Sequence, residues 1–190
     1  MLNTLAGIIA SSGGAAAGGD YESISTVTVT SNVTSITFSS IPSTYRHLQI
    51  RVLAKSNAAG NDGLAHHAEI AFNGDTTLAN YNRHQLRGDG STAVSNYSGS
   101  AAPTACYVPS AGLTNIFGVG VVDVLDYANT NKYKVTRTLT GSNNNAVSAE
   151  FVGLTSGLWQ STAAITSITI KCGTESFTQY SSFALYGIKG

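Results

Sequence analysis

Apolar and polar residues alternate along most of the chain after residue 20. In residues 47–55 (HLQIRVLAK), Leu48, Ile50 and Val52 fall on one face of an extended strand, whereas Gln49 falls on the other. No stretch keeps a helical period over three turns. The pattern therefore predicts half-buried β-strands and no long helix.

Segments of this kind recur along the chain and are separated by turns rich in Gly, Asn and Ser. Residues 115–127 carry apolar side chains on both faces, so we expect them to form the most central strand. Residues 91–103 are rich in Ser, Gly and Ala, and we expect them to form the longest surface loop. The expected strands are residues 21–30, 33–38, 47–55, 68–73, 83–87, 106–108, 115–127, 132–139, 147–154, 164–172 and 182–188.

Many short strands with polar turns favour an all-β, antiparallel fold. No internal repeat has the spacing of a propeller. We therefore expect a jelly-roll-like β-sandwich over residues 21–190, with a different all-β sandwich as the alternative. A chain of 190 residues has the length of one ordinary domain.

The first twenty residues differ in kind from this domain. Leu2, Leu5, Ile8 and Ile9 form a short apolar run, and a Ser/Gly/Ala tract follows it. A signal peptide has a Lys or Arg before its apolar run, and none precedes this one. The run is also far shorter than the ~20 residues of a membrane span. Burial of these four side chains in a neighbour would yield about 1.5–3 kcal/mol each, which is close to the cost of ordering the backbone of residues 1–9 at about 1–2 kcal/mol per residue. We expect residues 1–20 to be an arm and linker that anchors the protein in a larger assembly.

Charge is scarce and balanced. Charged residues make up 11% of the chain, against about 25% in ordinary domains, and the formal net charge is zero. The Lys and Arg residues are scattered and form no basic stripe, so we expect no nucleic-acid partner. Neutral outer faces of this kind suit packing against neighbouring subunits.

One short segment contains residues that bind metals in other proteins. His67 and Glu69 have the i, i+2 spacing that places two ligands on one face of a strand, with Asp62 and His84 nearby in sequence. His66 then points the opposite way, so the segment departs from the His-x-His pattern of cupin metalloenzymes. We expect strand-edge polar residues here, and no metal or other cofactor.

The remaining candidates for chemistry also favour structural roles. Asp123 and Asp126 lie three apart and face opposite sides of a strand, so they form no acid/base pair. No Gly-x-Ser-x-Gly motif is present. Cys106 and Cys172 define no zinc motif; a disulfide between them is the less favoured alternative to a core position for Cys172. We therefore expect a protein that is not an enzyme.

Four aromatic residues are candidates for ligand or partner contact. Trp159 has polar and glycine neighbours typical of a loop, and Tyr81, Tyr97 and Tyr107 are also expected in loops. An exposed Trp can stack on a sugar ring, whereas a buried Trp packs over the edge of a sandwich core. The structural interpretation is favoured, and glycan contact is the alternative.

Four stretches carry a resemblance to a known group of proteins. They are residues 41–50 (IPSTYRHLQI), 72–75 (FNGD), 80–90 (NYNRHQLRGDG) and 180–190 (YSSFALYGIKG). These stretches resemble small virion structural proteins of tailed bacteriophages, many of them from phages of aquatic bacteria and cyanobacteria. The resemblance implies a virion component that forms a homo-oligomer, with a trimer favoured, and it carries over no active site.

These observations lead to one principal functional expectation and two alternatives. The principal expectation is a non-enzymatic virion protein that its arm anchors to other virion proteins. It is either a capsid-decoration or head-fibre subunit, or a component of the tail. The first alternative is a carbohydrate- or host-receptor-binding module of the tail-fibre or tail-tip type that uses exposed aromatic loops to bind surface glycan. The second is a cupin-like metalloenzyme. Neither a membrane nor a nucleic acid is expected as a partner.

Overall fold

The computed structural model describes residues 19–62, 64, 66–144 and 150–190. Within them it contains twelve strands and one short 3-10 turn, η1 (Leu78–Asn80). The strands are β1 (Tyr21–Thr28), β2 (Ser35–Phe38), β3 (His47–Ala54), β4 (His66–Phe72), β5 (Tyr81–Gly88), β6 (Ala93–Gly99), β7 (Thr104–Val108), β8 (Gly118–Val124), β9 (Lys134–Ser142), β10 (Phe151–Trp159), β11 (Ile168–Lys171) and β12 (Ser182–Ile188). The prediction of an all-β fold is confirmed.

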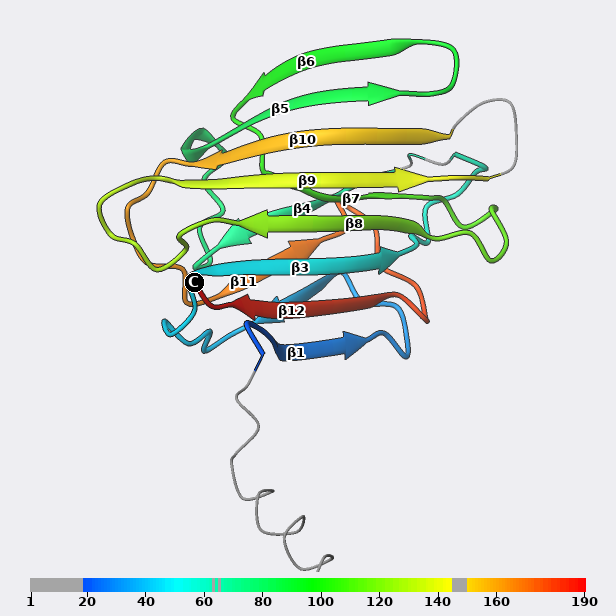
Figure 1. Ribbon diagram of the computed structural model, residues 1–190. Coiled ribbons are helices and arrows are strands. Elements are labelled where there is room, and N and C mark those ends of the chain that lie inside the picture. The colour runs from blue at the N-terminus through cyan, green and yellow to red at the C-terminus, as the bar shows by residue number, and fades with distance from the viewer. Residues whose placement is uncertain (1–18, 63, 65, 145–149) are drawn as a thin grey trace, which may run out of the picture.

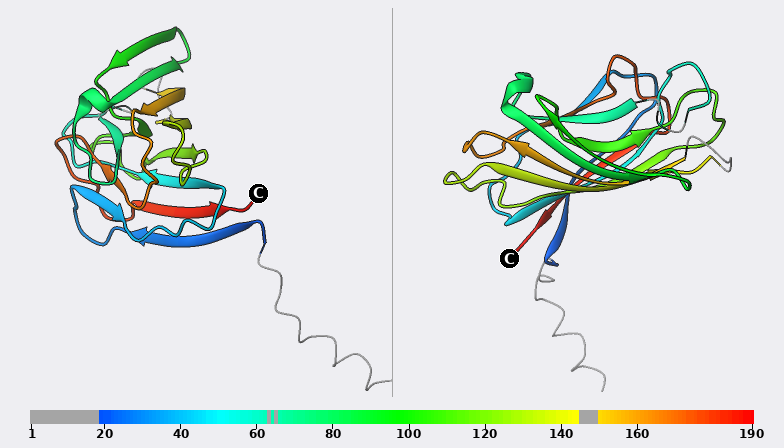
Figure 2. Two further views of the ribbon diagram at one scale, coloured as in Figure 1. Left: turned by 90° about the vertical axis from the view of Figure 1, so that its left-hand side faces the viewer. Right: turned by 90° about the horizontal axis from the view of Figure 1, so that it is seen from above.

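The strands form two antiparallel sheets that lie face to face (Figures 1 and 2). The large sheet has eight strands in the order β1-β12-β3-β8-β9-β10-β5-β6. The small sheet has four, in the order β2-β11-β4-β7, and lies behind the large sheet in Figure 1. The hairpin of β5 and β6 therefore lies at the end of the large sheet farthest from β1.

The apolar core lies between the two sheets. Ile36, Ile70 and Ile168 of the small sheet belong to the same buried cluster as Ile50 and Leu185 of the large sheet. These residues occupy alternate positions of their strands, so the period of two in the sequence places them all on inward faces. In these strands, β2, β3, β4, β11 and β12, apolar residues point into the core as in an ordinary β-sandwich.

Strand β7 packs unusually close to the large sheet. A Cβ atom at Gly120 would lie 2.0 Å from the carbonyl oxygen of Ala105, and one at Gly118 would lie 1.7 Å from that of Tyr107. Glycine is therefore required at both positions of β8 for the backbone of β7 to approach. All five residues of β7 are buried as a result.

Two sequence-based expectations about strands need correction. Residues 91–103 were expected to form a loop, but they contain β6, which pairs with β5 in unbroken register. The Ser-rich composition of β6 is explained by its position, because six of its seven residues are exposed and none is buried. Strand β8 lies centrally, as expected, but only one of its faces is buried, and Val119 and Val121 face solvent.

A buried lysine holds the connection between β8 and β9. The ammonium of Lys134 donates hydrogen bonds to the carbonyl oxygens of Asn129, Lys132 and Thr162 at 2.7, 3.0 and 3.1 Å. Its side chain is fully buried, and burial lowers the pKa of Lys134. This arrangement satisfies three carbonyl groups that strand pairing leaves free, so Lys134 has a structural role.

Candidate functional site

The sequence pattern is inverted in the two middle strands of the large sheet. In β9, Thr136, Thr138 and Thr140 face inward and are buried, whereas Val135 and Leu139 face outward and are exposed. Strand β10 repeats this arrangement, with glycine and threonine inside and Val152, Leu154 and Leu158 outside. Apart from Phe151 and Trp159 at the two ends of β10, the large apolar side chains of both strands therefore point away from the core.

The inward threonines are explained by the edge of the small sheet. The hydroxyl of Thr138 donates to the carbonyl oxygen of Thr104 at 2.7 Å, and the hydroxyl of Thr140 accepts the backbone N–H of Tyr107 at 2.8 Å. Both partners belong to β7, which is an edge strand with no further strand to pair with. A valine at either threonine position would leave these buried backbone groups without partners.

The outward residues form two apolar rows across the sheet. Val121, Leu139, Leu154 and Leu86 are in direct register on β8, β9, β10 and β5. The neighbouring row contains Leu53, Val119, Gly141 and Val152, again in register on adjacent strands. Leu139 is 59% exposed and Val152 is 61% exposed. We refer to these eight residues as the outer apolar face; it looks toward the viewer in Figure 1.

A polar row borders this face. Gln49, Asp123 and Arg137 are in register on β3, β8 and β9. Arg137 donates to Asp123 at 2.6 Å, and Gln49 donates to the other carboxylate oxygen at 3.0 Å. Burial alone would raise the pKa of Asp123, but these hydrogen bonds bring it below its ordinary value. The charges of Asp123 and Arg137 neutralise each other within the surface, which lowers the cost of covering it.

The outer side of the small sheet is polar by comparison. Ser35, Thr37 and Lys171 are exposed there, and the hydroxyls of Thr37 and Thr169 lie 3.0 Å apart. A sheet face that remains in water normally carries residues of this kind. The apolar character is therefore specific to the large sheet.

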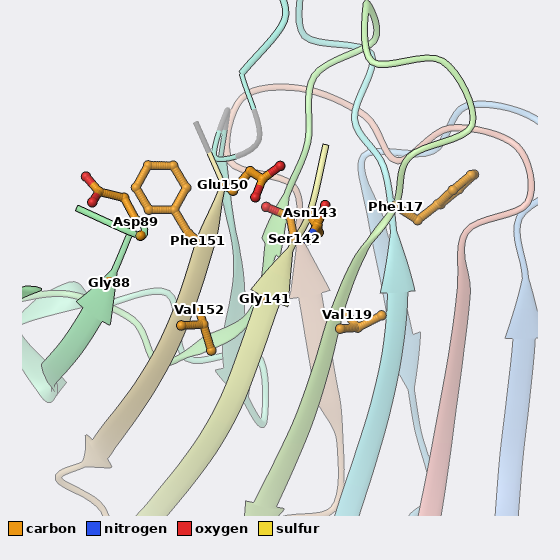
Figure 3. A pocket seen from close by; sticks show the side chains of 11 residues that line it. Gly88, Asp89, Phe117, Val119, Gly141, Ser142, Asn143, Glu150, Phe151 and Val152 are labelled. Carbon is orange, nitrogen blue, oxygen red and sulfur yellow. The ribbon is translucent and has the colours of Figure 1, made fainter. Parts of the chain in front are cut away.

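Two hollows lie on or beside the outer apolar face. The first, of about 800 Å³, lies over β5, β6, β9 and β10. Residues that line it include His84, Leu86, Tyr97, Leu125, Val135 and Leu154. The second, of about 540 Å³, lies at the ends of the strands, and Figure 3 shows Asp89 and Phe151 toward one end of it and Phe117 toward the other. Both hollows are open enough to receive side chains of another protein.

Asp89, in the second hollow, already has partners within its own turn. Its Oδ1 accepts the backbone N–H groups of Ser91 and Thr92 at 2.9 and 2.7 Å, and both hydroxyls also donate to the carboxylate. These bonds hold the pKa of Asp89 well below its usual range. The carboxylate therefore stabilises the β5–β6 turn.

The sequence-based expectation of loop positions is wrong for all four aromatic candidates, and three of the four are buried. Trp159 ends β10 and is 3% exposed, while Tyr81 in β5 and Tyr107 in β7 are fully buried. The indole N–H of Trp159 donates to the Asp75 carboxylate at 2.8 Å, and its ring stacks on Tyr81. These rings are core residues whose faces are closed to a sugar.

Tyr97 differs from the other aromatic candidates. It lies on β6 and is 60% exposed, although in a strand and not in the expected loop. Its ring contacts that of His84 at a centroid distance of 4.8 Å, and its hydroxyl donates to Asn82 at 2.9 Å. Tyr97 is thus the one predicted contact residue that borders the first hollow.

The residues considered as metal ligands are spread over different elements. His66, His67 and Glu69 lie on β4, whereas His84 lies on the outward side of β5 and Asp62 accepts the N–H of Leu64 in a loop. Among the residues that the structure describes, no group of three or more His, Cys, Asp or Glu side chains is placed to hold a metal ion.

His67 is the most perturbed member of this set. Burial, together with the positive charges of Arg83 and Arg87, lowers the pKa of His67 to about 4. Its Nε2 has no hydrogen-bond partner in the described part of the chain, and its ring meets that of Tyr107 edge-on. His67 is therefore neutral at physiological pH and contributes to packing.

The two cysteines are free and fully buried. Burial raises the pKa of both the Cys106 and the Cys172 thiols, which keeps them protonated. Cys172 lies in the same cluster as Ile168 and Ile170, so its predicted core position is confirmed.

The predicted anchor residues, Leu2, Leu5, Ile8 and Ile9, lie outside the described residues. No helix in the described part of the chain is long and apolar enough to cross a membrane. Searches against models of protein families, curated proteins and solved structures found no match.

Proposed function

We propose that this protein is a non-enzymatic structural subunit of a tailed-phage virion, and that neighbouring subunits cover its outer apolar face. The observation that carries the proposal is the pair of apolar rows, in register and exposed, on a protein whose other sheet has a polar outer side. Contiguous exposed apolar residues that are bordered by polar ones mark interaction surfaces.

The size of the face determines how much of a contact it can supply. Four strand spacings and three residues along a strand give a footprint of about 19 by 10 Å, or roughly 190 Å². A standard interface buries about 800 Å² of accessible surface per partner. The flat footprint underestimates accessible surface, and the two hollows add to it. The outer apolar face can therefore form the centre of a contact, and surrounding residues must supply most of its area.

We further propose that the fold derives from a jelly roll. Successive strands alternate between the sheets from β2 to β5, and they return to the small sheet at β7 and β11. The meander β8-β9-β10 lies between β3 and β5 and widens the large sheet. This order supports a jelly roll with an expanded second sheet.

The proposal assigns the remaining parts of the chain as follows. Residues 1–20 anchor the domain to other virion proteins through Leu2, Leu5, Ile8 and Ile9. The resemblance of residues 41–50, 80–90 and 180–190 to phage virion proteins supports a place in the particle, either on the capsid or at the tail.

A glycan- or receptor-binding function is the second candidate, favoured by one observation. Tyr97 exposes its ring at the border of the larger hollow, beside His84. This function predicts glycan affinity that is lost in Tyr97→Ala and kept in Tyr133→Ala, since Tyr133 is also more than half exposed but does not line the hollow. Equal binding by both variants would exclude this site.

Immunogold electron microscopy of purified particles tests the principal proposal, with antibody raised against residues 21–190. Label on the capsid identifies a decoration or head-fibre subunit, and label at the tail identifies a tail component. Particles that stay unlabelled, although the antibody binds the free protein, would refute the virion role.

A further inference from the structure

The two sheets have four edge strands in the described part of the chain, and three of them are protected against further pairing. Strand β1 has a register shift between Ser23 and Ser25, and β2 is only four residues long. The backbone of β7 is buried and bonded to threonine hydroxyls of β9. Bulges, short length and coverage are the usual devices that stop edge strands from associating.

Strand β6 has none of these devices. Its seven residues, AVSNYSG, include no charged residue and no proline, and their pairing with β5 shows no register shift. Six of the seven residues are exposed. A long, uncharged, regular edge of this kind is a template for pairing with another strand.

The hairpin register determines which backbone groups of β6 are free. The backbone N–H of Asp89 bonds the carbonyl oxygen of Thr92, which sets the alternation along the hairpin. Counting from this pair, Val94, Asn96 and Ser98 direct their N–H and C=O groups toward β5. The N–H and C=O groups of Ser95 and Tyr97 therefore point away from the sheet.

We propose that β6 pairs with β6 of a second copy of this chain, antiparallel and about a two-fold axis at Asn96. This register places Ser95 opposite Tyr97 of the second copy and pairs all seven residues. The outward groups of residues 93, 95, 97 and 99 then form about eight hydrogen bonds between the copies. The two large sheets become one continuous sheet.

The sequence of the edge favours a second copy as its partner. A two-fold axis brings a strand against its own image, so any charge on it would meet a like charge. Strand β6 has no charge to repel its image, and Asn96 meets Asn96, whose amides can bond each other. The pairing also joins the two outer apolar faces, because Leu86 lies on the adjacent strand.

This inference rests on the proposed function, because it specifies the contact by which the oligomer forms. It also changes one expectation, since a two-fold contact produces an even number of copies whereas the resemblance favours a trimer. The particle role and the β6 contact nevertheless remain separable by experiment.

Sedimentation velocity of the full chain over a range of concentrations is the first test. Ser95→Pro removes an outward N–H but no bond to β5, a position where an edge strand tolerates proline. We expect wild type and the matched control Ser95→Thr to dimerise, and Ser95→Pro to dimerise at least about tenfold more weakly, because both copies lose a donor. A monomeric wild type, or equal association by all three proteins, would overturn the proposal.

Cysteine cross-linking tests the register. Asn96→Cys places two thiols directly opposite at a non-hydrogen-bonded pair, with Cα atoms about 4.5 Å apart, within the range of a disulfide. In Ser95→Cys the two thiols are diagonal, with Cα atoms about 7–8 Å apart, too far for a disulfide. The native cysteines are buried and do not compete.

We expect a covalent dimer after mild oxidation of Asn96→Cys and none of Ser95→Cys. Equal cross-linking of both variants, or of neither, would contradict the register. An oligomer that Ser95→Pro forms as tightly as wild type would remove the β6 contact and leave the virion role standing. Unlabelled particles in the immunogold experiment would remove the virion role and leave the β6 contact standing.

Discussion

Substitution of Gly120 by alanine provides a direct test of the packing that shapes the large sheet. The new Cβ would lie 2.0 Å from the carbonyl oxygen of Ala105 and 3.1 Å from the Cβ of Cys106. Ordinary carbon contacts are about 3.5 Å or longer, so β7 would have to move by roughly 1 Å or more. The atom in the way is backbone and has no rotamer by which to avoid the clash.

The cost follows from what holds β7 in place. Overpacking of a core costs about 1–3 kcal/mol, and more where backbone must move. The same movement would stretch the bonds from Thr138 and to Thr140, and a buried group left without a partner costs about 1–3 kcal/mol. We expect Gly120→Ala to lower the free energy of unfolding by about 3–5 kcal/mol.

Thermal and urea unfolding followed by circular dichroism measure this loss. For a domain of this size, 3–5 kcal/mol corresponds to a fall in Tm of about 6–20 °C. Gly88→Ala is the matched control, because its Cβ would meet only the carbonyl oxygen of Thr92 at 3.7 Å. Equal stability of the two variants would refute the close approach of β7 to β8.

Three further predictions concern polar groups in the interior. The pKa of His67 is lowered to about 4, so the unfolded chain binds a proton that the folded one does not, and folding loses up to about 3 kcal/mol as the pH falls from 6.5 to 4. His67→Gln should flatten the plot of unfolding free energy against pH in this window; an unchanged slope would contradict the assignment. Lys134→Met should cost about 2–4 kcal/mol in urea unfolding, because three carbonyl groups lose their donor, whereas the exposed control Lys132→Met should cost less than about 1 kcal/mol. Thr138→Val should cost about 1–3 kcal/mol and Thr169→Val, on the outer side of the small sheet, close to nothing; equal losses would contradict the role of the inward threonines.

The sequence predicts strands well where their apolar residues face the core. The bounds expected for β12, residues 182–188, coincide with the observed strand, and β3 differs from its expected range by one residue. In both strands the alternation agrees with burial, since Ile50 and Leu185 lie in the core. Local pattern and tertiary packing favour the same face there.

The same pattern is ambiguous in β9. Alternation shows that Val135 and Leu139 share one face and Thr136 and Thr138 the other, but it does not show which face is inside. Strand β7 determines which face of β9 points inward. Its free backbone groups bond the hydroxyls of Thr138 and Thr140, so the threonine face lies against it. The outer apolar face was therefore missed, although threonine at every second position over residues 136–140 is a usable signal.

The aromatic candidates were misplaced for a related reason. The polar neighbours of Trp159 are typical of a loop, yet its indole N–H bonds Asp75, 84 residues earlier in the chain. A partner so distant in sequence leaves no trace in the local pattern. Tyr97 was expected to be exposed and is, because it pairs with His84 and so lies on the outer side of the large sheet.

The most direct test of the central claim is incorporation of variants into particles, measured by quantitative mass spectrometry of purified virions. Leu86→Glu/Leu139→Glu places two charges on the outer apolar face at exposed positions, and Ser35→Glu/Thr37→Glu places two on the polar side of the small sheet. Both variants should fold with nearly wild-type stability. The account predicts that the first is depleted from particles at least about tenfold, while the second is incorporated normally. Equal incorporation of the two variants would contradict an interface on this face.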